Sequence, residues 1–147
     1  MRTILFSVVI ALAALSLAGP STAETHQAKS NTARQVAESW LSIVDQGRYA
    51  DSWDALAQLL QKEVTREEWV ERVTALRTIA GTLDSRKLVG ARYAKNLPGA
   101  PPGEYVVVQY RSAFSQEKSV RETVVPMLDS DGKWRVSSYF IQAELPQ

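Results

Sequence analysis

Hydrophobic residues recur at helical spacing through the first half of the chain beyond residue 31. The first such segment, residues 32–46, opens with Thr32 and Gln35 at the spacing of a capping box. Two more segments, residues 49–61 and 65–81, repeat the pattern, and the last of them begins with the capping sequence "TREE". The pattern therefore predicts three helices in succession.

Beyond residue 81 the hydrophobic period shortens to two, which indicates strands. The four segments with this period are residues 85–93, 104–115, 120–128 and 134–141. Three helices followed by four strands with short turns predict an α+β domain, in which the N-terminal helices pack on a curved, mostly antiparallel four-stranded sheet.

The turn sequences predict how the last three strands pair. The loop "SDG" favours a tight hairpin with Leu128 opposite Trp134 and Val124 opposite Ser138. A turn at "SQEKS" places Ser112 opposite Glu122. These registers put the even-numbered residues on one apolar face, which we expect the helices to cover. Pro126 interrupts a strand and predicts a bulge that changes the register beyond it.

The chain begins like an exported protein. Arg2 precedes a charge-free apolar run over residues 4–18, and small residues follow up to Ala23. This layout is typical of a cleavable signal peptide, so we expect residues 1–23 to be removed and the protein to be periplasmic or secreted. The polar residues 24–31 are predicted to form a flexible tail, and residues 32–147 one domain with no membrane span.

Charge and composition exclude several functional classes. Removal of residues 1–23 takes away Arg2 and no acidic residue, which leaves 16 basic and 16 acidic residues, so nucleic acid is not an expected partner. The chain has no cysteine, and its single histidine, His26, falls in the predicted tail. We therefore expect no histidine-based nucleophilic site, no metal site and no cofactor.

Polar residues on the inward face are the candidate site. Four polar residues interrupt the apolar even-numbered positions and are predicted to line a pocket, namely Tyr110, Ser112, Glu122 and Ser138. A buried carboxylate must be paired, hydrated or neutral. Either Glu122 pairs with an arginine such as Arg77 or Arg92, which is the interpretation that we favour, or it lies in a polar-floored pocket.

Three further features carry a structural and a functional interpretation. The loop of residues 97–103, "LPGAPPG", is predicted to be a stiff connector, with ligand recognition as the alternative. The four tryptophans fit a core better than a ligand cavity. The odd-numbered face of the sheet mixes apolar and cationic residues and suits a weak homodimer contact; its apolar members are Tyr105, Val107, Val125, Met127, Tyr139 and Ile141.

The stretches "AESWLSIVDQGRYADSWD", "LPGAPPGEYVVVQYRSAF", "ETVV" and "KWRVSSYFI" together resemble the bacterial domain-of-unknown-function family 4019, over residues 34–141. The order of helices and strands is also similar to the nuclear-transport-factor-like superfamily, whose cone-shaped domains have a pocket between helices and sheet. The first resemblance implies no activity. The second covers isomerases, dehydratases and binding modules, and fold alone does not choose among them.

The sequence thus favours an exported, non-catalytic binding or interaction module for a small apolar ligand or a protein partner. One alternative is a histidine-free lyase or isomerase that uses Glu122 as acid or base, with Tyr110 as a hydrogen-bond donor. Another is a structural envelope protein. A catalytic Glu122 must face an open cavity, whereas a binding module accepts a wholly apolar one.

Overall fold

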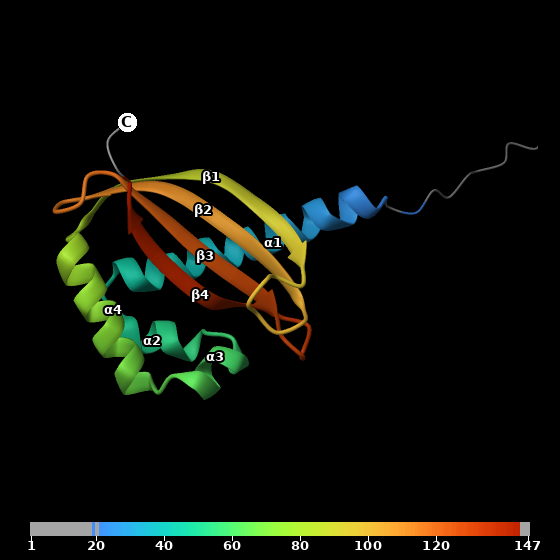
Figure 1. The fold of residues 1–147 in the computed structure, drawn as a ribbon, viewed down its shortest axis with the longest axis horizontal. Coiled ribbons are helices and arrows are strands. Elements are labelled where there is room, and N and C mark those ends of the chain that lie inside the picture. Colours follow the sequence, from blue (N-terminus) through green and yellow to red (C-terminus); the bar gives the residue numbers. More distant parts are fainter. Residues whose placement is uncertain (1–18, 20, 145–147) are drawn as a thin grey trace, which may run out of the picture.

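The computed structural model describes residues 19 and 21–144, in which helices come first and strands follow (Figure 1). The helices are α1 (Thr22–Asp45), α2 (Tyr49–Asp54), α3 (Gln58–Glu63) and α4 (Arg66–Ala80), and the strands are β1 (Leu83–Lys95), β2 (Glu104–Phe114), β3 (Val120–Leu128) and β4 (Trp134–Ala143). The strands form an open antiparallel sheet in the order β1-β2-β3-β4, which confirms the predicted α+β class.

Most of the predicted signal segment lies outside the described residues, which include only residues 19 and 21–23 of it. Among the helices of the described part, none has the length and apolar character needed to cross a membrane.

Helix α1 begins ten residues earlier than the sequence pattern predicted. Ser21 caps it, because the Ser21 hydroxyl accepts from the Glu24 N–H at 3.2 Å and the Glu24 carboxylate accepts from the Ser21 N–H at 2.7 Å. The predicted flexible tail, residues 24–31, is therefore helical. His26 stacks on Tyr93, with ring centroids 4.2 Å apart, and tertiary contacts of this kind extend the helix.

The second predicted helix is divided into α2 and α3, so the described chain has four helices where three were predicted. Leu56 and Ala57 separate them. Leu56 forms a parallel bridge with Val136 of β4, and the Ala57 N–H donates to the Val136 carbonyl at 2.8 Å. A backbone that pairs with a strand cannot remain helical, and the apolar spacing alone does not reveal this long-range contact.

The hairpin of β3 and β4 agrees with the sequence up to its bulge. Leu128 pairs with Trp134, as predicted. The register then shifts between Val125 and Pro126, which confirms the bulge that the proline predicted.

Beyond the bulge, the inward and outward positions of β4 are exchanged. Val124 pairs with Tyr139, not with the predicted Ser138. Tyr139 packs against the core, whereas the side chain of Phe140, predicted to be inward, is 52% exposed. The one residue added by the bulge accounts for both corrections, because side chains alternate along a strand.

The register of β2 and β3 differs from the prediction by two residues. Tyr110 pairs with Glu122 and Ser112 with Val120, so Ser112 is not directly opposite Glu122. Within the turn, the Phe114 N–H donates to the Glu117 carbonyl at 2.7 Å. A shift of two positions keeps the same residues inward, so the predicted even-numbered core face of these two strands is confirmed.

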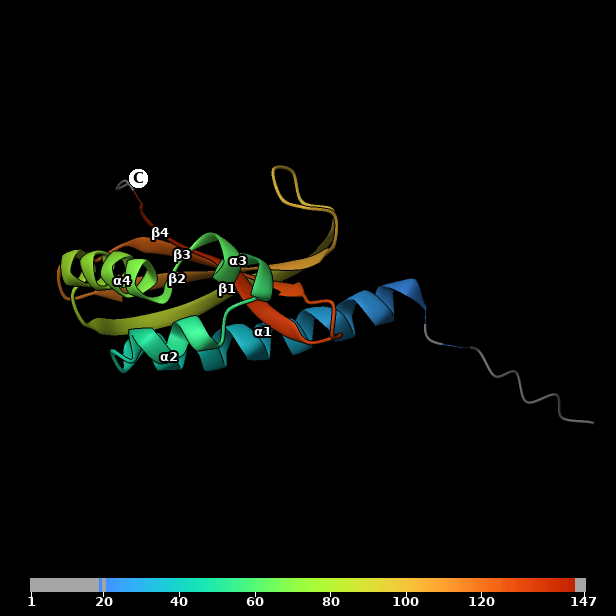
Figure 2. The same cartoon turned by 90° about the horizontal axis from the view of Figure 1, so that it is seen from below.

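Helix α1 packs across the inward face of the sheet, and α2 lies on the same side (Figure 2). Small residues, Ala33 and Ala37, allow the helix to approach the strands closely. The core formed between them includes Trp40, Leu41, Val44, Val106, Val108, Val124 and Val136. Burial of each large side chain stabilises the fold by about 1.5–3 kcal/mol.

The opposite face is partly covered by the chain itself. Leu97 and Ala100 of the loop after β1 pack on a cluster that contains Tyr105, and the Tyr105 hydroxyl donates to the Pro101 carbonyl at 2.7 Å. Figure 2 shows this loop on the side of the sheet away from α1. Three residues of the predicted dimer surface are therefore buried, namely Tyr105, Val125 and Met127, and Tyr139 faces the core.

Candidate functional site

Glu122 is buried completely in the middle of the sheet. Its side chain is 0% exposed, and on the neighbouring strands it pairs with Tyr110 of β2 and Ile141 of β4. A lone carboxylate at such a position would be strongly destabilising, so its partners decide what it can do.

Arg86 of β1 is the main partner of Glu122. Its Nε lies 2.8 Å from Glu122 Oε1 and its Nη2 lies 3.0 Å from Oε2. The same guanidinium holds Asp45, at the end of α1, through bonds of 2.6 and 3.1 Å. The predicted pairing of Glu122 with an arginine is confirmed, but its main partner is Arg86. Of the two arginines named from the sequence, Arg92 is exposed and Arg77 lies at the longer distance of 3.9 Å.

Arg77 of α4 completes a closed network. Its Nη2 donates to Asp45 Oδ1 at 2.6 Å, and its Nη1 lies 3.9 Å from Glu122 Oε2. The Tyr139 hydroxyl donates to Glu122 Oε2 at 2.8 Å, and the Ser112 hydroxyl donates to Oε1 at 2.5 Å. This network of two cations and two anions joins α1, α4 and all four described strands.

The two arginines of the network stabilise the ionised form of Asp45. Burial acts to raise the pKa of Asp45, but hydrogen bonds and charge interactions with Arg86 and Arg77 outweigh it and hold that pKa below its ordinary value. Burial also raises the pKa of Tyr139, and the neighbouring Glu122 raises it further. Glu122, the candidate acid or base, is bonded to Arg86, Ser112 and Tyr139. It lines none of the cavities described below.

Tyr110, the proposed hydrogen-bond donor of a catalytic site, points into the core. Its side chain is 3% exposed, and its hydroxyl has no hydrogen-bond partner among the described residues. Burial raises the pKa of this hydroxyl, so it stays protonated. The ring lies beneath Arg86, whose guanidinium carbon is 5.9 Å from the ring centroid.

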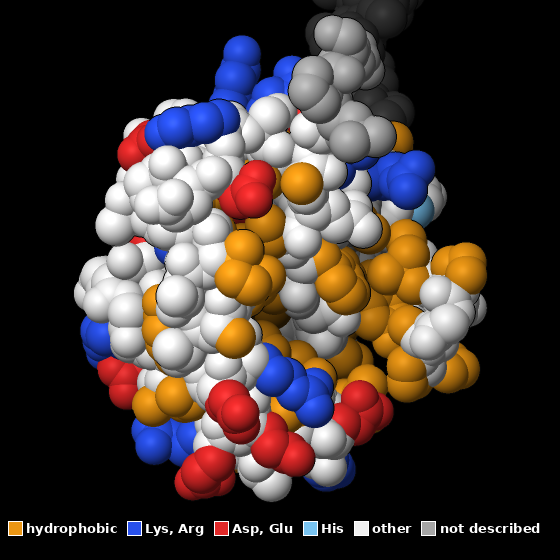
Figure 3. Space-filling model, turned by 60° about the vertical axis from the view of Figure 1, so that its left-hand side comes forward, with side chains coloured by type: hydrophobic (Ala, Val, Ile, Leu, Met, Phe, Trp, Pro, Cys, Tyr) orange, Lys and Arg blue, Asp and Glu red, His pale blue; other side chains and the backbone are white. Residues whose placement is uncertain are grey.

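An open cleft lies between α4 and β4, at the edge of the sheet. Its volume is about 260 Å³. Figure 3 shows a hollow on this side of the molecule with hydrophobic side chains in and around it and basic side chains at its edge. The residues that line the cleft are Leu60, Trp69, Arg72, Val73, Leu76, Ser137, Ser138, Tyr139 and Phe140.

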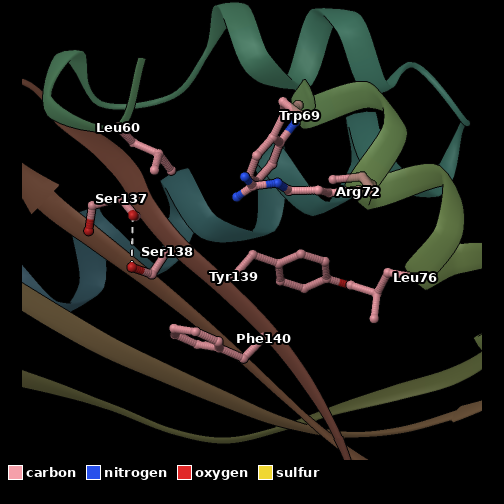
Figure 4. Close-up of a pocket in the computed structure, with 9 residues that line it drawn as sticks. Leu60, Trp69, Arg72, Leu76, Ser137, Ser138, Tyr139 and Phe140 are labelled. Atoms are coloured by element: carbon pink, nitrogen blue, oxygen red, sulfur yellow. Dashed lines mark hydrogen bonds between the residues drawn. The ribbon is translucent and has the colours of Figure 1, made fainter. Parts of the chain in front are cut away.

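The two walls of the cleft come from different elements (Figure 4). Trp69, Arg72 and Leu76 project from α4, whereas Ser138 and Phe140 belong to β4. The bulge at Pro126 gives β4 this orientation, because it turns Phe140 away from the core. Of the four predicted pocket residues, only Ser138 lines this cleft, while Tyr110, Ser112 and Glu122 lie in the interior.

A second hollow, of about 650 Å³, lies beside the end of α1 and is lined by Asp45, Tyr49 and Arg77, among others. Its charged groups already pair with each other, as described above. In the part of the chain that the structure describes, no group of three or more histidine, cysteine or acidic side chains could hold a metal ion.

Sequence reasoning missed Arg72, Asp45 and Arg86. Arg86 pairs with Ser112 on the inward face, so its place in a strand next to a polar inward position was a usable signal. Asp45 and Arg72 gave no such signal, since each is one of many polar residues on a helix.

Comparison with known proteins identifies the family of this chain. The family described as "Protein of unknown function (DUF4019)" matches residues 36–139, a span that contains the network and every residue that lines the cleft except Phe140. A search of curated proteins and a search of solved structures found no match. The likeness to the nuclear-transport-factor-like superfamily remains an expectation from the sequence. Since the family match covers most of the chain, the protein belongs to the DUF4019 family.

Proposed function

We propose that this protein is an exported, non-catalytic binding module that holds a small apolar ligand in the cleft between α4 and β4. One observation carries the proposal. The interior charged groups pair with one another in the network, whereas the cleft leaves apolar side chains in contact with water, including Phe140 at 52% exposure. Small-molecule sites are typically concave and mostly apolar with few polar groups.

The size of the cleft limits the ligand. Its volume of about 260 Å³ is slightly below the range of drug-sized pockets. A single short aliphatic chain or a small aromatic molecule of two or three rings suits this space, and a large cofactor does not.

Binding of the neutral fluorescent probe N-phenyl-1-naphthylamine tests the proposal. Ser138→Trp places a large side chain in the cleft and should abolish the fluorescence increase. The matched control is Gln109→Trp on β2, which β3 separates from β4 and which does not line the cleft; this variant should bind like wild type. Absence of binding to wild type, or equal binding by both variants, would overturn the proposal.

Export is the second part of the proposal and rests on the apolar run of residues 4–18. N-terminal sequencing of the exported protein should begin at or near Glu24. Such a cut would remove the Ser21 cap, which contributes about 1 kcal/mol to a helix, so the first turn of α1 should fray in the mature protein. Exported protein that retains Met1 would contradict signal cleavage.

A further inference from the structure

The donors that line the cleft identify the chemistry of its ligand. We infer that the ligand is an anionic amphiphile, a small carboxylate with an apolar tail, whose carboxylate binds Arg72. This inference rests on the proposed function, because it assigns a ligand class to the same cleft.

All but one of the side-chain donors in the cleft are already used within the protein. The Trp69 indole N–H donates to Ser52 Oγ at 3.0 Å, and the Tyr139 hydroxyl donates to Glu122. The hydroxyls of Ser137 and Ser138 donate to the carbonyls of Val125 and Ser137, each at 2.7 Å. A ligand therefore meets free side-chain N–H groups only at Arg72.

Arg72 carries the only formal charge among the residues that line the cleft. Arg72 is exposed, and its helix is rich in glutamate. Within residues 19 and 21–144 it nevertheless forms no ion pair and no side-chain hydrogen bond. Glu68 lies four residues earlier on the helix, and its pKa is lowered by the bonds to Thr65 and, to a smaller extent, by the charge of Arg72. The Glu68 carboxylate accepts from the N–H and hydroxyl of Thr65, at 2.9 and 3.1 Å, and forms no bond to Arg72. Glu71 lines a separate groove, with Arg66 and Glu67.

A guanidinium binds oxyanions well, and its single charge favours a carboxylate. Its N–H groups form a planar fork that matches the two oxygens of a carboxylate. With one arginine in the cleft, a singly charged head group is balanced, whereas a doubly charged phosphate would not be. The apolar walls, from Val73 and Leu76 of α4 and Phe140 of β4, then receive the tail. Charge and apolar surface together thus define an amphiphile.

Three probes with the same tail separate head-group selectivity from simple apolar binding. We would titrate the protein with octanoate, 1-octanol and octyltrimethylammonium and follow displacement of N-phenyl-1-naphthylamine. The two charged probes stay below their micelle concentrations, and 1-octanol stays below its solubility limit. Octanoate should bind roughly tenfold tighter than 1-octanol, because the hydrogen bond to a charged group is added to the same tail. The cationic probe should bind most weakly, and added salt should weaken octanoate alone.

Arg72→Gln should reduce octanoate binding to the level of 1-octanol and leave 1-octanol unchanged. Arg66→Gln removes the same charge from the same helix outside the cleft, and it should change neither. Equal affinity for the three probes, or octanoate binding that survives Arg72→Gln, would overturn the ligand class and leave the binding module standing. If none of the probes binds to wild type, both the ligand class and the proposed function fail.

Discussion

Arg77 and Arg72 lie on the same helix, five residues apart, and have opposite environments. Arg77 is 6% exposed and joins the network of Asp45 and Glu122, whereas Arg72 is exposed beside the cleft and unpaired within the described chain. Five residues turn a helix by about 140° beyond a full turn, so the two side chains leave α4 in different directions. One arginine therefore contributes to stability, and the other is free to bind a ligand.

The difference shows how to interpret a charge next to apolar residues. In the network, the guanidinium groups of Arg77 and Arg86 lie within bonding distance of carboxylates. Removal of one charged side chain leaves another, largely buried charge without a partner. At the cleft, the charge is solvated and its loss leaves nothing buried without a partner. Variants of the two regions should therefore affect different measurements: stability in the first and binding in the second.

The largest effect is expected for Glu122→Gln. The substitution takes from Arg86, which is largely buried, one of its two carboxylate partners and should lower the free energy of unfolding by about 3 kcal/mol. Urea denaturation, monitored by circular dichroism, measures this change in the free energy of unfolding. The comparison is sharpened by Arg72→Gln, which should change stability by no more than about 0.5 kcal/mol. A Glu122→Gln protein as stable as wild type would reject the structural role of the network.

Acid should weaken the network next. The pKa of Asp45 is lowered in the folded state, so its carboxylate stabilises the fold above its unfolded pKa of about 3.9, and this contribution disappears as the pH falls through the lower folded pKa. Asp45→Asn should cost about 2 kcal/mol at neutral pH. It should also flatten the decline of stability below pH ~4. Unfolding curves of wild type and Asp45→Asn, measured from neutral pH to below pH ~4, test whether the Asp45 contribution is lost in acid. Parallel plots of stability against pH for the two proteins would contradict it.

The loop of residues 97–103 should have a smaller, purely structural effect. Replacement of Pro101 and Pro102 by Ala increases the entropy of the unfolded chain and should lower stability by about 0.5–2 kcal/mol. The loop packs on Tyr105, on the far side of the sheet from α1, so probe binding in the cleft should not change. If binding is lost while the melting temperature is retained, the loop is a recognition element.

The smallest effect is expected at Tyr110. Its hydroxyl is buried without a partner, so Tyr110→Phe removes a poorly solvated group and should be neutral or stabilise the protein by up to about 1 kcal/mol. Ser112→Ala is the contrast, because it removes a bond to Glu122 and should destabilise. Thermal melts of the pair decide, and a clear loss of stability in Tyr110→Phe would show that the hydroxyl is bonded.

Much of the sheet could be predicted from the sequence, because strand alternation and turn residues act locally. The strands, the Leu128–Trp134 pair and the bulge at Pro126 all follow from short patterns. The start of α1 could not be found in this way. Its cap, Ser21, lies in the segment interpreted as a signal peptide, and its first turns are held by tertiary contacts such as His26 on Tyr93.

The candidate site was predicted less well, for a related reason. The requirement that Glu122 be paired follows from its inward position, but the identity of Arg86 depends on how β1 is registered against β2. The cleft depends on the consequence of the bulge, which turns Phe140 outward and Tyr139 inward. One residue added to a strand decides which side chains are available to a ligand.

The most direct test of the account is to map a bound ligand residue by residue. Titration of the ¹⁵N-labelled protein with octanoate should shift the amide resonances of Trp69 to Leu76 and of Ser137 to Phe140, and leave those of Ser112 and Glu122 unchanged. Shifts centred on Ser112 and Glu122 would show that the interior network is the binding site, and the assignment of structure to one region and binding to the other would be wrong.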